Sequence, residues 1–367
     1  MNFAFDEQQK SLGETVAALL ADHPSLTAPD PASDDDAAVW SALGELGLFA
    51  LLVPEMFGGV GLTLADLALS IEALGAGMAP PLVASTLIAT ELIARHGSDS
   101  QRRRFLPLIA AGDCRVALAL TEAGADYGTA PHSTVTGTSL DGRKLLVDGA
   151  DSADLLVVSA SRGLWLVDPR GDGVRIAREE CLDPSARSCA VRFESASIDG
   201  DAPLAAPALD RLAEIGATVH SGLLTGIAGR MLHASVDYAK TREQFGRPIG
   251  AFQAIKHRCA DMAVALEAAR SAAYYAFWTA ADGGSGHSAA ASMAKAYCGD
   301  VARSICNETI QVHGGMGFTW ELGLHRYLRR SKLLEHGFGD TAFHLERVIA
   351  HTLAQRGIGD AARRDAA

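Results

Sequence analysis

Two segments of the chain combine side chains and glycines that suit the binding of a phosphate-bearing ligand. The first runs from Tyr238 to Gln253 and reads YAKTREQFGRPIGAFQ. Glycine and proline are typical of turns, and the planar guanidinium of Arg242 can form paired hydrogen bonds with a phosphate. From these residues alone, the segment is either a structural turn between helices or a turn that contacts a ligand.

The second segment runs from Gln311 to Glu321 and reads QVHGGMGFTWE. Its three glycines follow a helical pattern, and glycine lets the backbone approach a ligand closely. Helix C-termini favour glycine in any case, so this segment by itself does not define a site.

Cysteine and histidine spacing predicts no metal site. The six cysteines, at positions 114, 181, 189, 259, 298 and 306, form no CxxC pair and no Cys/His set at zinc-ligand spacing. We therefore expect reduced, buried thiols, as in a cytoplasmic protein.

Composition excludes several classes of protein. The 367 residues are 48% hydrophobic and carry a net charge of −12, which disfavours a nucleic-acid binder and a basic membrane-surface protein. No signal peptide is readable, and no apolar stretch approaches the roughly 20 residues needed to span a bilayer. The sequence predicts a cytoplasmic protein without nucleic-acid or membrane partners.

The periodicity of apolar residues divides the chain into three domains of an α+β fold. Residues 1–113 show helical spacing, with about five helices, Thr63 as a plausible N-cap and a boundary at Gly97 and Ser98. Residues 114–206 contain short runs of β character separated by Gly, Asp and Pro, which predict an antiparallel sandwich or barrel.

Residues 207–367 return to helical spacing and predict a bundle of long helices. Small residues in GLLTGIAGRM would let neighbouring helices approach closely. The predicted long helical stretches are Ala208 to Lys240, Ala251 to Ala281, Ala289 to Gln311 and Tyr327 to Leu353.

The two segments, in this order and within a helix–sheet–helix layout, resemble motifs of the acyl-CoA dehydrogenase family. The resemblance covers essentially the whole chain. The first is similar to the family's YxxxRxQFGxPIxxFQ segment and the second to its QxxGGxGxxxE segment. Thr121 and Glu122 look like the start of its TEPGAGSD loop.

The resemblance implies an FAD enzyme that removes an α proton and a β hydride from an acyl-CoA and passes electrons to an electron-transfer flavoprotein. It also implies contacts across a subunit interface to the pyrophosphate and adenosine half of a neighbour's FAD. The implied cofactor-binding residues are Arg242, Gln244, Phe245, Gln253, Gln311, Gly314, Gly315 and, in the loop, Thr121. A guanidinium fork and glycine amides suit a pyrophosphate.

The flavin-ring side departs from the family pattern. Tyr127 replaces the usual serine of the loop, and Lys144-Leu-Leu-Val-Asp148 replaces KxWIT. Leu146 therefore occupies the position of the family's tryptophan, which packs on the flavin ring, and Asp148 occupies the position of the threonine that donates to the flavin. A carboxylate at that place opposes the negative charge of reduced flavin.

The catalytic base is also missing from its usual places. Phe338 aligns with the family's glutamate, and Gly216 aligns with the position where a subset of the family carries it. The nearest carboxylates are Glu214 and Asp340, each two residues from a base position. They are candidate bases if burial raises their pKa, and are otherwise ordinary surface carboxylates.

These departures lie on one side of the cofactor site, whereas the residues that reach a neighbour's FAD match. This pattern resembles the flavin-site-degenerate subunit of bacterial paired-subunit acyl-CoA dehydrogenases, including those that shorten steroid side chains. The sequence therefore predicts a subunit of a heterotetramer. The alternatives are a non-catalytic scaffold or regulatory subunit and a self-sufficient homotetramer with a relocated base.

Overall fold

The computed structural model describes residues 4–27, 35–125, 128–198, 203–282 and 286–356. It divides into two compact units. The sheet unit consists of Gln8–Ser70 and Gly77–Ala213, and the bundle unit of Met1–Glu7, Ile71–Ala76 and Glu214–Ala367.

The described N-terminal residues form the five α-helices that the apolar spacing predicts. They are α1 (Glu7–Ala21), α2 (Asp35–Glu45), α3 (Ala68–Ala76), α4 (Pro81–His96) and α5 (Asp99–Ala110). Ser98 begins α5 with a capping box, because its Oγ accepts from Gln101 N and its own N–H donates to the Gln101 side chain. Thr63 does not cap a helix as predicted. Its N–H and hydroxyl both donate to Asp66 Oδ2, which makes a separate turn ahead of α3.

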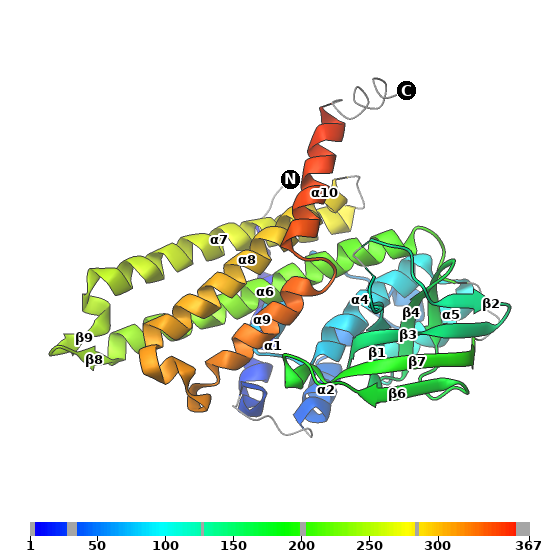
Figure 1. The fold of residues 1–367 in the computed structure, drawn as a ribbon, viewed down its shortest axis with the longest axis horizontal. Helices are drawn as coiled ribbons and strands as arrows, with labels where there is room; N and C mark the ends of the chain where they lie inside the picture. Colours follow the sequence, from blue (N-terminus) through cyan, green and yellow to red (C-terminus); the bar gives the residue numbers. More distant parts are fainter. Residues whose placement is uncertain (1–3, 28–34, 126–127, 199–202, 283–285, 357–367) are drawn as a thin grey trace. The chain divides into compact units, whose positions relative to one another are not determined.

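Two sheets form the middle of the chain (Figure 1). One has the order β1 (Val116–Ala119), β4 (Leu155–Ala160), β5 (Gly163–Val167), and the other has the order β2 (Thr134–Thr136), β3 (Ser139–Asp148), β7 (Ser188–Ser197), β6 (Val174–Arg178). The pairing is antiparallel as predicted, except that β1 and β4 are parallel. A parallel pair cannot be joined by a tight turn, and here the chain passes through β2 and β3 of the other sheet before it returns. The predicted runs did not include β6, which is rich in arginine and lies at a sheet edge.

Strand β3 carries a bulge that bears on function. Its pairing with β7 steps from Lys144 opposite Val191 to Val147 opposite Cys189, so that Leu145 and Leu146 have no partner on β7. Leu146 has a φ of 51°, in the left-handed region that leucine rarely adopts.

Long helices form the bundle unit. They are α6 (Ala208–Thr241, with its first turns in the sheet unit), α7 (Gln253–Asp282), α8 (His287–His313), α9 (Leu324–His336) and α10 (Thr341–Gln355). Figure 1 shows α7 and α8 side by side along most of their length. The predicted close approach at GLLTGIAGRM is confirmed at Gly226, where an added Cβ would lie 1.9 Å from the carbonyl oxygen of Glu72 on α3.

The last predicted stretch, Tyr327 to Leu353, is not one helix. It is broken between α9 and α10 by residues 337–340, because Phe338 and Gly339 adopt φ angles of 61° and 110°. Asp340 then caps α10 by accepting from Phe343 N at 2.9 Å.

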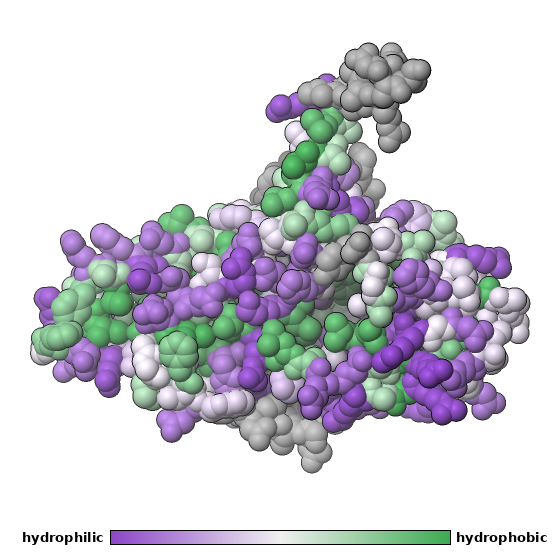
Figure 2. Space-filling model, in the orientation of Figure 1, coloured by the Kyte–Doolittle hydropathy of each residue, from purple (hydrophilic) through white to green (hydrophobic). Residues whose placement is uncertain are grey.

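The exposed faces of the helices are largely polar, with local exceptions. Leu345, Ile349 and Leu353 follow one another at single-turn spacing on the exposed side of α10, where Figure 2 shows apolar surface. None of the described helices is long and apolar enough to cross a membrane. The six cysteines are unbridged; four of them are buried, as predicted, whereas Cys181 and Cys259 are half-buried.

Candidate functional site

The first motif folds into a tight hairpin between α6 and α7. Its strands β8 (Glu243–Gln244) and β9 (Arg247–Pro248) pair Gln244 with Arg247 and leave Phe245 and Gly246 as a two-residue turn. Both turn residues have positive φ, 55° and 76°, as the twist of a two-residue hairpin requires. Phe245 is 91% exposed, so the hairpin holds an aromatic ring in solvent in a conformation that costs energy.

The polar residues predicted from the first motif surround this hairpin. Arg242 and Gln244 are exposed, and the carbonyl of Arg242 accepts from Ile249 N at 2.8 Å, which closes the base of the hairpin. Gln253 is the first residue of α7 and is also exposed. The side chains that the resemblance assigns to a cofactor are therefore open to an incoming ligand.

The second motif ends α8 and continues into a 3-10 turn over Gly314–Phe318. Gly314 has φ 59° and ψ −135°, a conformation that is nearly restricted to glycine. Within the described residues, no atom beyond the adjoining residues lies within 4 Å of a Cβ placed on Gly314 or Gly315, and Gln311 is exposed one turn earlier. The glycines thus leave open space over their backbone, as close approach of a ligand requires.

The two motifs are joined through side chains of α6 and α8. The Tyr238 ring, at the start of the first motif, stacks on the His313 ring of the second, with 4.2 Å between centroids and 24° between planes. One turn earlier, buried Ser235 donates to Thr309 Oγ1 at 2.9 Å, and Thr309 donates to the carbonyl of Met231 at 3.1 Å. Two segments that are 70 residues apart in sequence therefore end at one place in the bundle unit.

These residues fit the ADP half of FAD. An exposed arginine fork, side-chain amides and open glycine backbone match a doubly charged pyrophosphate and a polar nucleoside. Sequence reasoning did not identify the Tyr238–His313 contact. Both residues stand within the recognised motifs, but nothing in the spacing of one motif shows which residue of the other it meets.

The sheet unit contains the residues that the resemblance assigns to the flavin ring. Thr121 bridges Leu145 across the bulge, because its carbonyl accepts from Leu145 N at 2.9 Å. Leu146 is 48% exposed, and its N–H donates to Glu179 Oε2 at 3.2 Å. Asp148 accepts from the hydroxyl of Ser188. Tyr127 lies outside the described residues.

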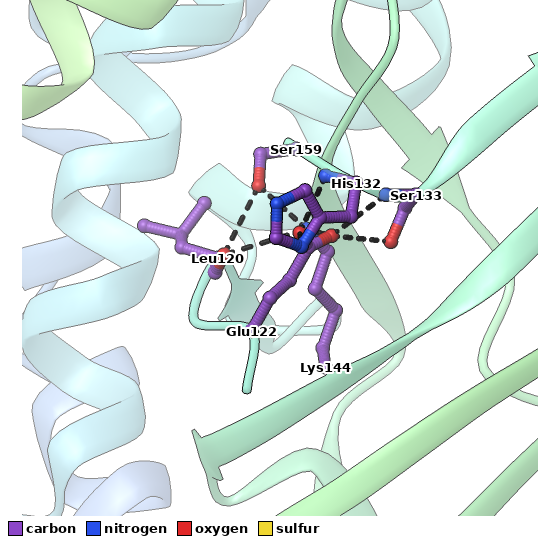
Figure 3. Close-up of polar contacts among 6 residues, drawn as sticks. All are labelled: Leu120, Glu122, His132, Ser133, Lys144 and Ser159. Atoms are coloured by element: carbon purple, nitrogen blue, oxygen red, sulfur yellow. Dashed lines mark hydrogen bonds and ion pairs between the residues drawn. The ribbon is translucent and has the colours of Figure 1, made fainter. Parts of the chain in front are cut away.

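A buried ion pair closes the base of the loop that follows Thr121 (Figure 3). Lys144 is fully buried and donates to Glu122 Oε1 at 2.6 Å and to Ser159 Oγ at 2.9 Å. The other contacts of Glu122 reach the far end of the loop, since its carboxylate accepts from His132 N, Ser133 N and Ser133 Oγ. One carboxylate therefore joins both ends of the loop to Lys144 of β3, which in turn bonds Ser159 of β4.

The pKa values of Glu122 and Lys144 are both shifted. Burial by itself raises the pKa of Glu122, but the hydrogen bonds from Lys144, Ser133 and His132 outweigh it and lower that pKa to about 2. Burial lowers the pKa of Lys144, against the opposing effect of Glu122. The sequence motifs contain both residues without indicating that they pair.

The two base positions of the family meet in the bundle unit. A Cβ on Gly216 would lie 2.3 Å from Cδ1 of Phe338, so the phenyl ring fills the space that a side chain at 216 would need. The Phe338 ring also packs edge-on against His220, with 4.8 Å between centroids. Neither position offers a group that accepts a proton.

The two candidate bases have other partners. Glu214 Oε2 lies 3.4 Å from Nδ1 of buried His287, whose Nε2 lies 3.0 Å from Thr218 Oγ1. Asp340 caps α10. Among the described residues, no group of His, Cys, Asp and Glu is arranged to hold a metal ion.

Comparison with known proteins gives the same family that the motifs suggest. The family described as "Acyl-CoA dehydrogenase, N-terminal domain" matches residues 6–113, and the one described as "Acyl-CoA dehydrogenase, C-terminal domain" matches residues 211–353. Acyl-CoA dehydrogenase IpdE2 of Mycobacterium tuberculosis is 33% identical over 89% of this chain and 91% of its own length.

Two further similarities point the same way. Acyl-CoA dehydrogenase FadE34 of Mycobacterium tuberculosis is 35% identical over 86% of this chain, which spans only 42% of that relative's length. A solved structure of the Tcur3481–Tcur3483 steroid acyl-CoA dehydrogenase superposes with a TM-score of 0.87 and 30% identity, covering 95% of this chain and 99% of that one. With the motif residues exposed as FAD binding requires, the chain belongs to the acyl-CoA dehydrogenase family of flavin-dependent oxidoreductases, whose cofactor is FAD.

Proposed function

We propose that this chain takes part in the α,β-dehydrogenation of an acyl-CoA thioester to the 2-enoyl-CoA as one subunit of a heterotetramer. It completes the FAD site of a homologous partner subunit by supplying the Arg242 hairpin and the Gly314 turn to the ADP half of the cofactor. FAD supplies the acceptor for the β hydride. An electron-transfer flavoprotein then takes up the electrons.

The observation that carries this proposal is the packing of Phe338 on Gly216. The family's two base positions are occupied here by a phenyl ring and by a glycine whose side-chain space that ring fills. Removal of an α proton needs an acceptor with a suitable pKa within hydrogen-bond reach. A chain without this acceptor, but with an open ADP-binding end, is suited to complete a site whose base lies on another subunit.

The surroundings of Leu146 support the same reading. Its backbone N–H is already bound by the Glu179 carboxylate, and the Asp148 carboxylate stands two residues away. A leucine cannot stack on a flavin as an indole does, and two carboxylates raise the energy of an anionic reduced ring. The structure named for Tcur3481 together with Tcur3483, which this chain resembles, is described as a steroid acyl-CoA dehydrogenase. A steroid side chain is therefore a reasonable acyl group for the first substrate screen.

The amount of FAD bound per chain distinguishes the proposed function from its alternatives. The chain purified alone should hold well under one FAD per chain and show little acyl-CoA turnover with an artificial electron acceptor. Co-expression with a homologous subunit that retains the tryptophan, threonine and glutamate should give one FAD per pair of chains and steady turnover.

A yellow homotetramer with one FAD per chain and steady turnover would instead establish a self-sufficient enzyme with a relocated base. If the partner subunit binds FAD equally well in the presence and in the absence of this chain, this chain is a scaffold or regulatory subunit.

A further inference from the structure

A buried lysine that the proposed function does not use lies beneath the turn that carries Phe338. Lys295 is in the middle of α8 and is 1% exposed. Its Nζ donates to the carbonyl oxygen of Glu335 at 2.6 Å and to that of Gly339 at 2.8 Å. One side chain therefore spans the turn, from the last residues of α9 to the residue before Asp340.

Two histidines bind carbonyls of the same region. His220 Nδ1 donates to the carbonyl of Leu334 at 3.2 Å, and His344 Nε2 donates to the carbonyl of Phe338 at 3.1 Å. These bonds select one tautomer of each neutral ring. Lys295, His220 and His344 come from α8, α6 and α10, so side chains of three helices hold the turn.

The turn needs this support because its conformation is unfavourable. Phe338 has a φ of 61°, a region that bulky side chains seldom occupy, and such strain persists only where neighbours hold it. Its neighbours pack closely around it, since a Cβ on Gly337 would lie 2.5 Å from His220 Cε1 and a Cβ on Gly339 would lie 2.4 Å from Phe343 Cδ1.

We propose that Lys295 is a positioning residue that, through its two carbonyl contacts, holds the 337–339 turn so that the side chain at position 338 stays against Gly216. The packing of Phe338 on Gly216, which keeps both base positions apolar, thus depends on Lys295. The amine of Lys295 bonds Glu335 and Gly339 rather than Phe338 or Gly216. This inference concerns the turn alone and stands or falls independently of whether the chain completes a partner's FAD site.

The amine does not need its charge for this role. A neutral amine has two hydrogens, and Lys295 has two carbonyl acceptors in the described part of the chain. Burial lowers the pKa of Lys295 to about 7, although Glu335 of α9, Cys298 of α8 and Asp340 at the start of α10 raise it. Burial, followed by the charge of Lys295, lowers the pKa values of His220 and His344 to about 3, so both stay neutral near pH 7. Arg330 of α9 also faces His220.

Hydrogen exchange of the turn amides tests this role. Lys295→Met preserves the length of the side chain but removes both donors, and should speed exchange in residues 337–344 by about 10-fold or more, as the loss of two hydrogen bonds predicts. Lys332→Met is the matched control on α9 and should leave this exchange unchanged. Equal exchange in both variants would overturn the proposal.

The pH dependence of hydrogen exchange in the turn distinguishes this role from that of a lysine that only fills space. Opening of the turn admits water to Nζ and returns its pKa toward the ordinary value, so opening takes up a proton and is favoured at lower pH. In the unmodified chain, the protection of the turn, corrected for intrinsic exchange, should therefore rise between pH 7 and pH 9. It should stay level in Lys295→Met.

A flat profile in the unmodified chain would contradict the proposal even if Lys295→Met fails to fold. In that case His344→Leu supplies a second variant, because it removes the bond to the Phe338 carbonyl, together with the ring contact to Phe343, and leaves both Lys295 bonds in place. It should speed exchange at residues 337–341, and unchanged exchange there would also count against the proposal.

Discussion

The ring of Tyr238 lies on the imidazole of His313 with 4.2 Å between their centroids, and this contact joins the two motifs that we propose bind the ADP half of FAD. His313 Nδ1 donates to the carbonyl of Thr309 at 2.8 Å, which orients the imidazole, and burial lowers its pKa, so the ring stacks in its neutral form. The open glycines follow directly after His313, and Arg242 lies one helical turn beyond Tyr238. The stack therefore joins the end of α6, next to Arg242, to the end of α8, next to the glycines.

Tyr238→Leu should reduce FAD retention in the assembled complex, because an aromatic pair contributes about 0.5–1.5 kcal/mol beyond its buried area. Tyr238→Phe keeps the ring and serves as the control, with retention unchanged. FAD dissociation followed by flavin fluorescence measures both variants. Equal retention by the two would mean that the motifs are held in place without the stack.

Arg242→Ala should weaken FAD retention in the complex by about 10- to 100-fold, since a desolvated charge-assisted hydrogen bond contributes on the order of 1.5–3 kcal/mol. Arg258→Ala is the matched control, because Arg258 pairs with Glu308 on the helix surface. Leu146→Trp and Asp148→Thr should change retention less than Arg242→Ala does. Normal retention by the Arg242 variant would remove this chain's assignment to the ADP half of the cofactor.

Glu214→Gln and Asp340→Asn should leave the chemical step in the complex within about twofold. Glu214 contacts His287, and asparagine can replace Asp340 as the cap of α10. Single-turnover reduction of the flavin by an acyl-CoA measures the step directly. Loss of a general base costs about 100-fold or more, so a fall of that size in either variant would place the base on this chain.

Glu122→Gln should destabilise the chain by about 3–5 kcal/mol, because it leaves Lys144 buried without its carboxylate. Glu194→Gln, at an exposed pair on β7, should stay within about 0.5 kcal/mol. Denaturant unfolding measures both variants.

Acid should remove the stabilisation that Glu122 provides. Its pKa is about 2 in the folded chain and near the ordinary glutamate value of 4.5 when unfolded, so the folded state binds the proton less tightly. The contribution is therefore complete above about pH 4.5 and is lost as pH falls toward 2. Unfolding curves between pH 5 and pH 3 should converge for the unmodified chain and Glu122→Gln; parallel curves would contradict the linkage.

The sequence by itself determined the family and the order of helical and sheet segments, and it predicts the residues that we propose bind the ADP half of FAD. Periodicity and motif spacing are local properties, and they predicted α6, α7 and α8 nearly to both ends and the boundary between α4 and α5 at Gly97 and Ser98. Local patterning failed where a break depends on surroundings. The helical spacing of Tyr327 to Leu353 continues across residues 337–340, yet the chain turns there.

Tertiary structure decided that turn. Lys295, His220 and His344 lie on three separate helices, and they bind carbonyls of the turn and of the end of α9 that precedes it, while Phe338 occupies the space above Gly216. The pairing of Glu122 with Lys144 and the stack of Tyr238 on His313 are likewise contacts between distant segments. Each depends on distances set by helix crossing and strand register, which the composition and spacing of a single segment do not encode.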